Sequence, residues 1–125
     1  MERVLLFNFK DESQLKAVQA VLSLLQIPDR LVPVEGYGMP LGALAAGESL
    51  PSVLSSQKWE LGGQMMVFAG LREDKLEGLL SMLRSNPACG KIPYKAVLTQ
   101  VNRNWDAFTL FHELQREHAA MHSAT

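Results

Sequence analysis

The chain has 125 residues, of which 47% are hydrophobic and 20% are charged, and its formal net charge is −1. These totals are typical of one globular domain and argue against an intrinsically disordered chain. The basic residues form no stripe and no polybasic run, so we expect neither nucleic acid nor a membrane surface as a partner.

The compartment follows from the cysteine usage and from the apolar runs. Cys89 is the single cysteine, which excludes an internal disulfide and indicates a reducing compartment. The stretch MERVLLFNFK lacks the long apolar run of a signal peptide. No segment reaches the roughly 18 to 20 apolar residues that a membrane-spanning helix needs. We therefore expect a cytoplasmic protein.

The first half begins with an apolar run at 4–7 that predicts a strand, followed by a helix. Asp11 is placed to cap this helix, with Gln14 reaching back to complete a capping box. Apolar residues then recur at spacings of three and four, as in an amphipathic helix: Leu15, Val18, Leu22 and Leu25. RLVPVE predicts a second strand, in which Pro33 favours an edge position.

The middle of the chain predicts one short helix and a connection. Pro40 suits the first position of a helix and Gly47 suits its end, so residues 40–46 are expected to be helical. The segment 47–63 is expected to be a mobile connection. It contains Trp59, which is costly to expose and is expected to fold back onto the domain.

The second half shows the same succession of elements. MMVFAGL at 65–71 predicts a strand, a helix is expected over 73–84, and YKAVLTQV predicts another strand. The last helix is expected over 105–122. Its apolar face is formed by Ala107, Phe111, Leu114, His118 and Met121.

The two halves align without gaps. Placing Phe7 on Phe68 brings Leu15 onto Leu76 and Leu22 onto Leu83. This agreement predicts an internal duplication. We therefore expect a single domain, 1–125, built from two βαβα halves (about 1–46 and 64–122) that the mobile connection 47–63 joins.

Two sheet topologies place the first and third strands in the middle, where their uninterrupted apolar character belongs. The favoured one is an α/β fold with a four-stranded parallel sheet of order 2-1-3-4 and helices on both faces. The link between the second and third strands exceeds 25 residues, which is long enough for a crossover. The alternative is a ferredoxin-like α+β sheet of order 4-1-3-2 with added helices.

Polar residues follow the expected strands. In a parallel sheet their carboxyl ends share one edge, where ligands of such folds bind. Asn8, Thr99 and Asn102 are then the floor of a ligand-binding site, with Tyr37 and Trp105 as its walls. The alternative is that these residues form turns, and that Asn102 or Asn104 caps the last helix.

Groups for catalysis or metal binding are scarce. The sequence contains no GxSxG, P-loop or GxGxxG motif, and no base is evident beside Cys89. His118 and His122 have a spacing that can bind a metal, but His112 points elsewhere on the helix. We expect no metal site, no cofactor and no catalytic residue.

Three stretches of the second half carry a resemblance: MMVFAGL, KAVLTQVNRNW at 95–105, and FHELQREHAAM. They resemble an uncharacterised bacterial family known only as a domain of unknown function, with a Lys-Ala-Val-Leu-Thr signature followed by Asn and Trp. YGMPLG at 37–42 is similar to a stretch upstream in longer members. The resemblance implies a bacterial protein, and it brings no activity, ligand or catalytic residue.

The sequence therefore favours a non-enzymatic small-molecule-binding or regulatory module. The alternative is a protein-interaction or self-association module, with a homodimer as its simplest form, because many apolar surfaces need cover. An enzyme is the least favoured reading. The expected partner is an unknown small molecule or an unknown protein.

Overall fold

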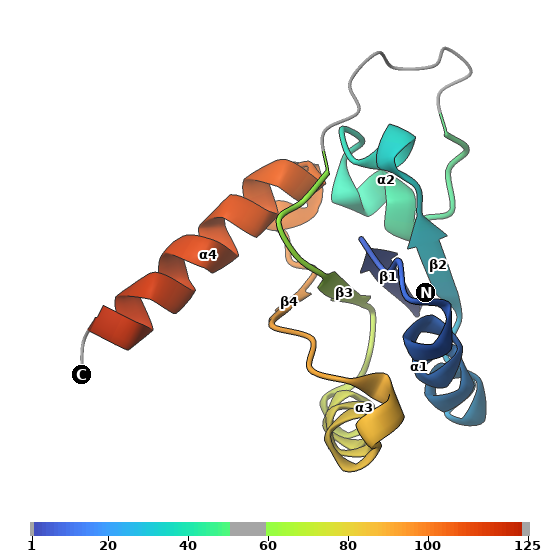
Figure 1. Ribbon diagram of the computed structural model, residues 1–125. Helices are drawn as coiled ribbons and strands as arrows, with labels where there is room; N and C mark the ends of the chain where they lie inside the picture. The colour runs from blue at the N-terminus through green and yellow to red at the C-terminus, as the bar shows by residue number, and fades with distance from the viewer. Residues whose placement is uncertain (1, 51–59, 124–125) are drawn as a thin grey trace.

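The computed structural model describes residues 2–50 and 60–123, with side chains described to Met121 (Figure 1). Trp59 and the rest of 51–59 lie outside the described residues. The described part alternates strands and helices. Its elements are β1 (Arg3–Phe7), α1 (Glu12–Leu24), β2 (Asp29–Val32), α2 (Leu41–Ala45), β3 (Met65–Ala69), α3 (Glu73–Ser85), β4 (Tyr94–Val97) and α4 (Ala107–Ser123).

The strands form one mixed sheet of order β2-β1-β3-β4. The predicted order 2-1-3-4 is confirmed. The prediction that all strands are parallel is wrong: β1 pairs parallel with β2, and β3 pairs parallel with β4, but β1 and β3 are antiparallel. The ferredoxin-like alternative is also wrong, because it places β1 between β4 and β3 rather than between β2 and β3.

The direction of β3 decides which face each helix covers. The crossover between two parallel strands is right-handed in nearly all proteins. Two such units that run in opposite directions in one sheet place their crossover helices on the same face, whereas a fully parallel 2-1-3-4 sheet places them on opposite faces. Here α1 and α3 lie together on one face and pack against the same core. The link between β2 and β3 is long enough for a crossover to a parallel strand, but β3 runs antiparallel to β1.

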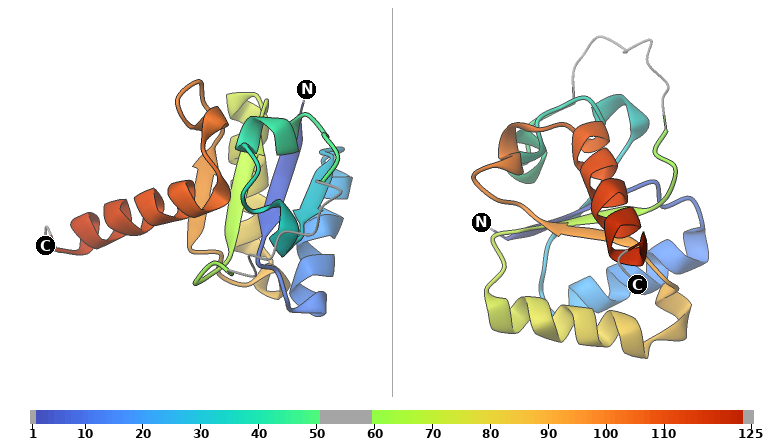
Figure 2. Two further views of the ribbon diagram at one scale, coloured as in Figure 1. Left: turned by 90° about the horizontal axis from the view of Figure 1, so that it is seen from above. Right: turned by 90° about the vertical axis from the view of Figure 1, so that its left-hand side faces the viewer.

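The sheet is covered on both faces, as the sequence predicts for its two central strands. Alternate residues of β1 enter different cores: Val4 and Leu6 pack with α1 and α3, and Leu5 and Phe7 pack with α2 and α4. All of Met65–Ala69 is likewise buried. The result is three layers, with helices above and below the sheet (Figures 1 and 2).

Helix α1 begins as predicted but its capping box does not form. Asp11 Oδ1 accepts hydrogen bonds from the backbone N–H groups of Ser13 and Gln14 at 2.9 and 3.1 Å. Gln14 does not reach back. Its side chain bonds instead to Gln64 and to the Cys89 carbonyl, and so ties α1 to the second half of the chain.

The two crossover helices match in length and position. Helices α1 and α3 each have 13 residues and begin at Glu12 and Glu73, which the gap-free alignment also pairs. The internal duplication itself stays a prediction. At the end of the predicted connection, Leu61 is buried in the core and Glu60 forms an ion pair with Lys10.

Helix α4 buries side chains against the sheet near its beginning, and its second half is exposed apart from contacts such as that of His118 with Tyr94. Ala107, Leu110 and Phe111 are buried, and residues 115–121 are exposed. Met121, on the same predicted apolar face, is 72% exposed. Figure 2 shows the second half of α4 extending away from the sheet, past the edge strand β4. The predicted apolar face is therefore partly covered and partly free.

Candidate functional site

Thr99 and Asn102 close the turn that follows β4. The Thr99 backbone N–H donates to Asn102 Oδ1 at 2.8 Å, and the Asn102 backbone N–H donates to Thr99 Oγ1 at 3.1 Å. The Asn102 side-chain amide also donates to the Val97 carbonyl at 3.0 Å. These side-chain hydrogen bonds all have backbone partners within the same turn.

The last helix has a different cap from the one expected. Helix α4 begins at Ala107, and Asp106 Oδ1 accepts a hydrogen bond from the Thr109 backbone N–H at 2.8 Å. Asn102 lies in the 3₁₀ turn Asn102–Asn104, one turn earlier. The prediction that Asn102 or Asn104 caps this helix is therefore wrong, although Asn102 does act as a turn residue.

Trp105 and Tyr37 join the two halves through their backbones. The Trp105 carbonyl accepts a hydrogen bond from the Leu41 N–H at 2.9 Å, and the Tyr37 carbonyl accepts one from the Ala107 N–H at 3.0 Å. The Tyr37 ring is buried and packs edge-on against Phe7 and Phe108. Both residues thus anchor the loops around α2 to the start of α4.

Asn8 lies near Tyr37 and has an unusual backbone. Its φ of 64° is left-handed, a conformation that asparagine tolerates better than most residues. Its side-chain amide donates to the Leu61 carbonyl at 3.1 Å. Desolvation raises the pKa of Tyr37, Glu60 raises it further, and a hydrogen bond with the Asn8 backbone partly offsets this.

Two of the three expected floor residues, Asn8 and Thr99, lie at opposite ends of the sheet. Asn8 follows Phe7, which pairs with Met65 at the beginning of β3, and Thr99 comes after Val97, which pairs with Phe68 near its end. The structure brings Asn8 to Tyr37 and Thr99 to Asn102, and the backbone bonds to Leu41 and Ala107 bring Trp105 and Tyr37 to the same core. The common floor expected of Asn8, Thr99 and Asn102 depended on a parallel sheet and does not form.

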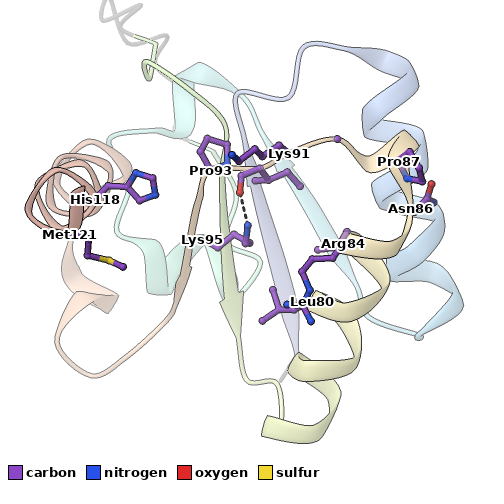
Figure 3. A pocket seen from close by; sticks show the side chains of 12 residues that line it. Leu80, Arg84, Asn86, Pro87, Lys91, Pro93, Lys95, His118 and Met121 are labelled. Atoms are coloured by element: carbon purple, nitrogen blue, oxygen red, sulfur yellow. Dashed lines mark hydrogen bonds between the residues drawn. The ribbon is translucent and has the colours of Figure 1, made fainter. Parts of the chain in front are cut away.

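A hollow lies elsewhere, at the β4 edge of the sheet between α3 and the projecting half of α4. We call it the basic groove. It encloses about 980 Å³, and Figure 3 shows its walls. Its lining comprises Leu80, Leu83 and Arg84 from α3, His118 and Met121 from α4, and Asn86, Pro87, Gly90, Lys91, Ile92, Pro93 and Lys95 from the intervening segment and β4.

The charged groups of the groove are all basic. Arg84, Lys91 and Lys95 contribute to its lining, and no carboxylate does so among the described residues. Burial lowers the pKa of Lys95, and the nearby charges of Arg84 and Lys91 lower it further. The Lys95 ammonium donates a short hydrogen bond of 2.5 Å to the Ile92 carbonyl. Arg84 and Lys91 therefore each lie close enough to Lys95 to repel its charge.

The remaining lining is largely apolar. Leu83 and Ile92 are buried at the base of the groove, and Leu80 is partly buried. On the α4 side the His118 ring packs against Tyr94, with centroids 5.6 Å apart. Apolar side chains beside three cations suit an anion that also carries apolar groups.

The sequence analysis missed Arg84, Lys91 and Lys95 because no two of them are adjacent in the sequence. A signal was nevertheless present. Between Glu77 and Asp106 the chain contains no Asp or Glu, yet it contains Arg84, Lys91, Lys95 and Arg103. A net charge near zero for the whole chain concealed this local excess of positive charge.

The cysteine and the possible metal ligands elsewhere in the described structure do not form a reactive site. Cys89 is buried and burial raises the pKa of its thiol, which is the opposite of what a nucleophile needs. In the described part of the chain, no three His, Cys, Asp or Glu side chains are grouped to hold a metal ion. None of the helices described is long and apolar enough to cross a membrane.

Comparison with known proteins gives one family. The chain matches no curated protein and no solved structure. The matching segment runs from the residue before β3 to Met121, and all residues that line the basic groove fall inside it. The resemblance drawn from the second half of the sequence is thereby confirmed: residues 64–121 match the family model of the domain of unknown function DUF3783.

Proposed function

We propose that the protein is a binding module for an anionic ligand and that the basic groove is its site. One observation carries the proposal: Arg84, Lys91 and Lys95 all line the groove, and no carboxylate among the described lining residues neutralises them. The charges of Arg84 and Lys91 disfavour the charged form of Lys95 in the free protein. An anion that enters the groove relieves this repulsion, so its binding is favoured.

The form of the groove supports a ligand larger than a simple ion. Its volume of about 980 Å³ is at the upper end of the range for sites that hold drug-sized molecules. Leu83 and Ile92 supply apolar surface at its base, while Lys91 and Lys95 supply charge. This combination supports a carboxylate or phosphate group attached to an apolar body.

Binding is a better account of the groove than catalysis. Its lining supplies cations but no thiol, hydroxyl or carboxylate side chain to act as nucleophile. We therefore infer a non-enzymatic module, in which ligand binding regulates something else. The ligand-binding role predicted from the sequence is a separate proposal, which the basic groove does not require. It concerns Asn8, Tyr37, Thr99, Asn102 and Trp105.

The test is a thermal-shift screen of the purified protein against phosphate, citrate, nucleotides and acyl phosphates. A ligand at 100 times its dissociation constant stabilises the folded state by about 2.7 kcal/mol, which raises Tm by several degrees. The effect should weaken as the salt concentration rises. Absence of stabilisation by any anion would contradict the proposal.

The matched variants remove the same charge from different places. Lys91→Gln with Lys95→Gln removes two charges from the groove, whereas Lys16→Gln with Arg72→Gln removes two exposed charges on α1 and before α3. We expect the first pair to abolish the anion-dependent shift and the second pair to preserve it. Equal loss in both pairs would mean that only the net charge matters.

A further inference from the structure

The outer edge of β4 is open along the basic groove. Among the described strands β4 pairs only with β3. The Leu98 N–H donates to the Phe68 carbonyl, so the backbone groups of Ala96 and Leu98 point toward β3. Backbone groups alternate in direction along a strand, and those of Pro93, Lys95 and Val97 therefore point outward.

This edge offers four backbone groups to a partner. Asn102 already bonds to the outward carbonyl of Val97, which confirms the direction and closes that end of the edge. The N–H and carbonyl of Lys95, the N–H of Val97 and the carbonyl of Pro93 have no backbone partner within the described residues. Pro93 has no N–H, so the edge ends there. The open edge from Pro93 to Val97 is long enough to pair with a short extended peptide.

The side chains around the edge define what the peptide must carry. Tyr94 and Ala96 face α4, whereas Lys95 faces the opposite side of the sheet, where Arg84 also lines the groove. Figure 3 shows Lys95 between α3 and the His118 and Met121 side chains of α4. An added strand would alternate in the same way. One set of its side chains would meet Lys95 and Arg84, and the other would meet Met121.

We propose that β4 receives an extended acidic peptide of another protein, which adds to the sheet along the basic groove. This proposal rests on the anion-binding function of the same groove and names the class of its ligand. Charge decides between the peptide and a second copy of this chain. Pairing of two β4 edges would bring the Lys95 and Arg84 groups of both copies together, which like-charge repulsion opposes.

The probe is a labelled peptide in which glutamate and valine alternate, with its affinity measured by fluorescence anisotropy. Its controls are the same peptide N-methylated at alternate amides, a lysine–valine peptide, and unlabelled citrate as a competitor. We expect the glutamate–valine peptide to bind, and loss of each backbone hydrogen bond to weaken binding roughly 2- to 12-fold. The lysine–valine peptide should not bind.

Two variants test the strand edge without changing its charge. Val97→Pro removes one outward N–H, whereas Val97→Ala retains it, so only the proline variant should weaken binding. Amide resonances of Lys95 and Val97 should shift on titration with the peptide. If Val97→Pro does not fold, the N-methylated peptide tests the complementary hydrogen bonds on the natural protein, from the peptide N–H groups to the outward carbonyls of Pro93 and Lys95.

The outcomes separate this proposal from the one on which it rests. If citrate binds through Lys91 and Lys95 but N-methylation of the peptide changes nothing, the added strand is wrong and anion binding stands. If neither citrate nor the peptide binds, both proposals fail. A third outcome would overturn the peptide proposal in favour of a second copy of this chain. Sedimentation would give the mass of a dimer, and the amide resonances of Lys95 and Val97 would shift as the protein concentration rises, without any peptide.

Discussion

Thr99 and Asn102 hydrogen-bond to each other in both directions, with each side chain accepting from the backbone N–H of the other residue. The pattern resembles a capping box, in which residues three apart satisfy each other's backbone donors. Asn102 is only 8% exposed, and its amide also bonds to the Val97 carbonyl. The pair therefore holds the chain as it leaves β4 and turns toward α4.

Removal of this pair should lower stability. Asn102→Ala leaves the Thr99 N–H and the Val97 carbonyl without their partner, and we expect a loss of about 1 to 3 kcal/mol in the free energy of unfolding. Thr99→Val should cost less, because Thr99 is exposed. Gln100→Ala, on the same turn, is the control. Urea denaturation measures all three, and unchanged stability of Asn102→Ala would contradict a structural role.

Two substitutions should separate the contribution of the Asn8 backbone conformation to stability from that of the Asn8 side chain. Its φ of 64° favours glycine, whereas alanine pays about 1 kcal/mol or more for a left-handed conformation. Both substitutions lose the hydrogen bond to the Leu61 carbonyl. We therefore expect Asn8→Ala to be less stable than Asn8→Gly by about 1 kcal/mol in urea denaturation. Equal stabilities would mean that the conformation is not strained.

Tyr37 should make the protein sensitive to alkali. Its pKa in the folded state is raised by burial above the ordinary value of 10.0. The folded protein therefore holds this proton more tightly than the unfolded chain, and the resulting stability is present below about pH 10 and is lost as the pH rises through the folded-state pKa. The measurement is Tm from pH 8 to pH 11.

The control for that measurement is a substitution that removes only the hydroxyl. Tyr37→Phe removes the titrating group from the buried ring, so its alkaline decline in Tm should be shallower than that of the natural protein. Equally steep declines in the two proteins would mean that other groups cause the loss of stability at high pH.

Cys89 should react slowly with thiol reagents. It is buried beneath α1, burial raises the pKa of its thiol, and the thiolate is the reactive species. We expect Ellman's reagent to label the folded protein more than about tenfold slower than the protein in concentrated urea. A folded-state rate equal to the unfolded rate would place the thiol at the surface.

The elements of this protein and their succession along the chain could be predicted from the amino-acid sequence alone. Spacings of three and four identified α1 and α3, and Asp11 marked the beginning of α1. The uninterrupted apolar runs predicted β1 and β3 in the middle of the sheet, which left the strand orders 2-1-3-4 and 4-1-3-2, and the favoured order 2-1-3-4 is the one observed. These predictions are correct because each depends on residues that are close in sequence, or on whether a single strand is covered on both faces.

The tertiary structure was needed to establish the direction of β3 and, with it, whether the site residues expected from the sequence share one edge of the sheet. A link of more than 25 residues permits either direction, and the apolar pattern of a strand covered on both faces reads the same in both. The antiparallel pairing separates Asn8 from Thr99 and puts α1 and α3 on one face of the sheet. Arg84 and Lys95 come together within the β3–α3–β4 unit, because packing brings together charges that the sequence keeps apart.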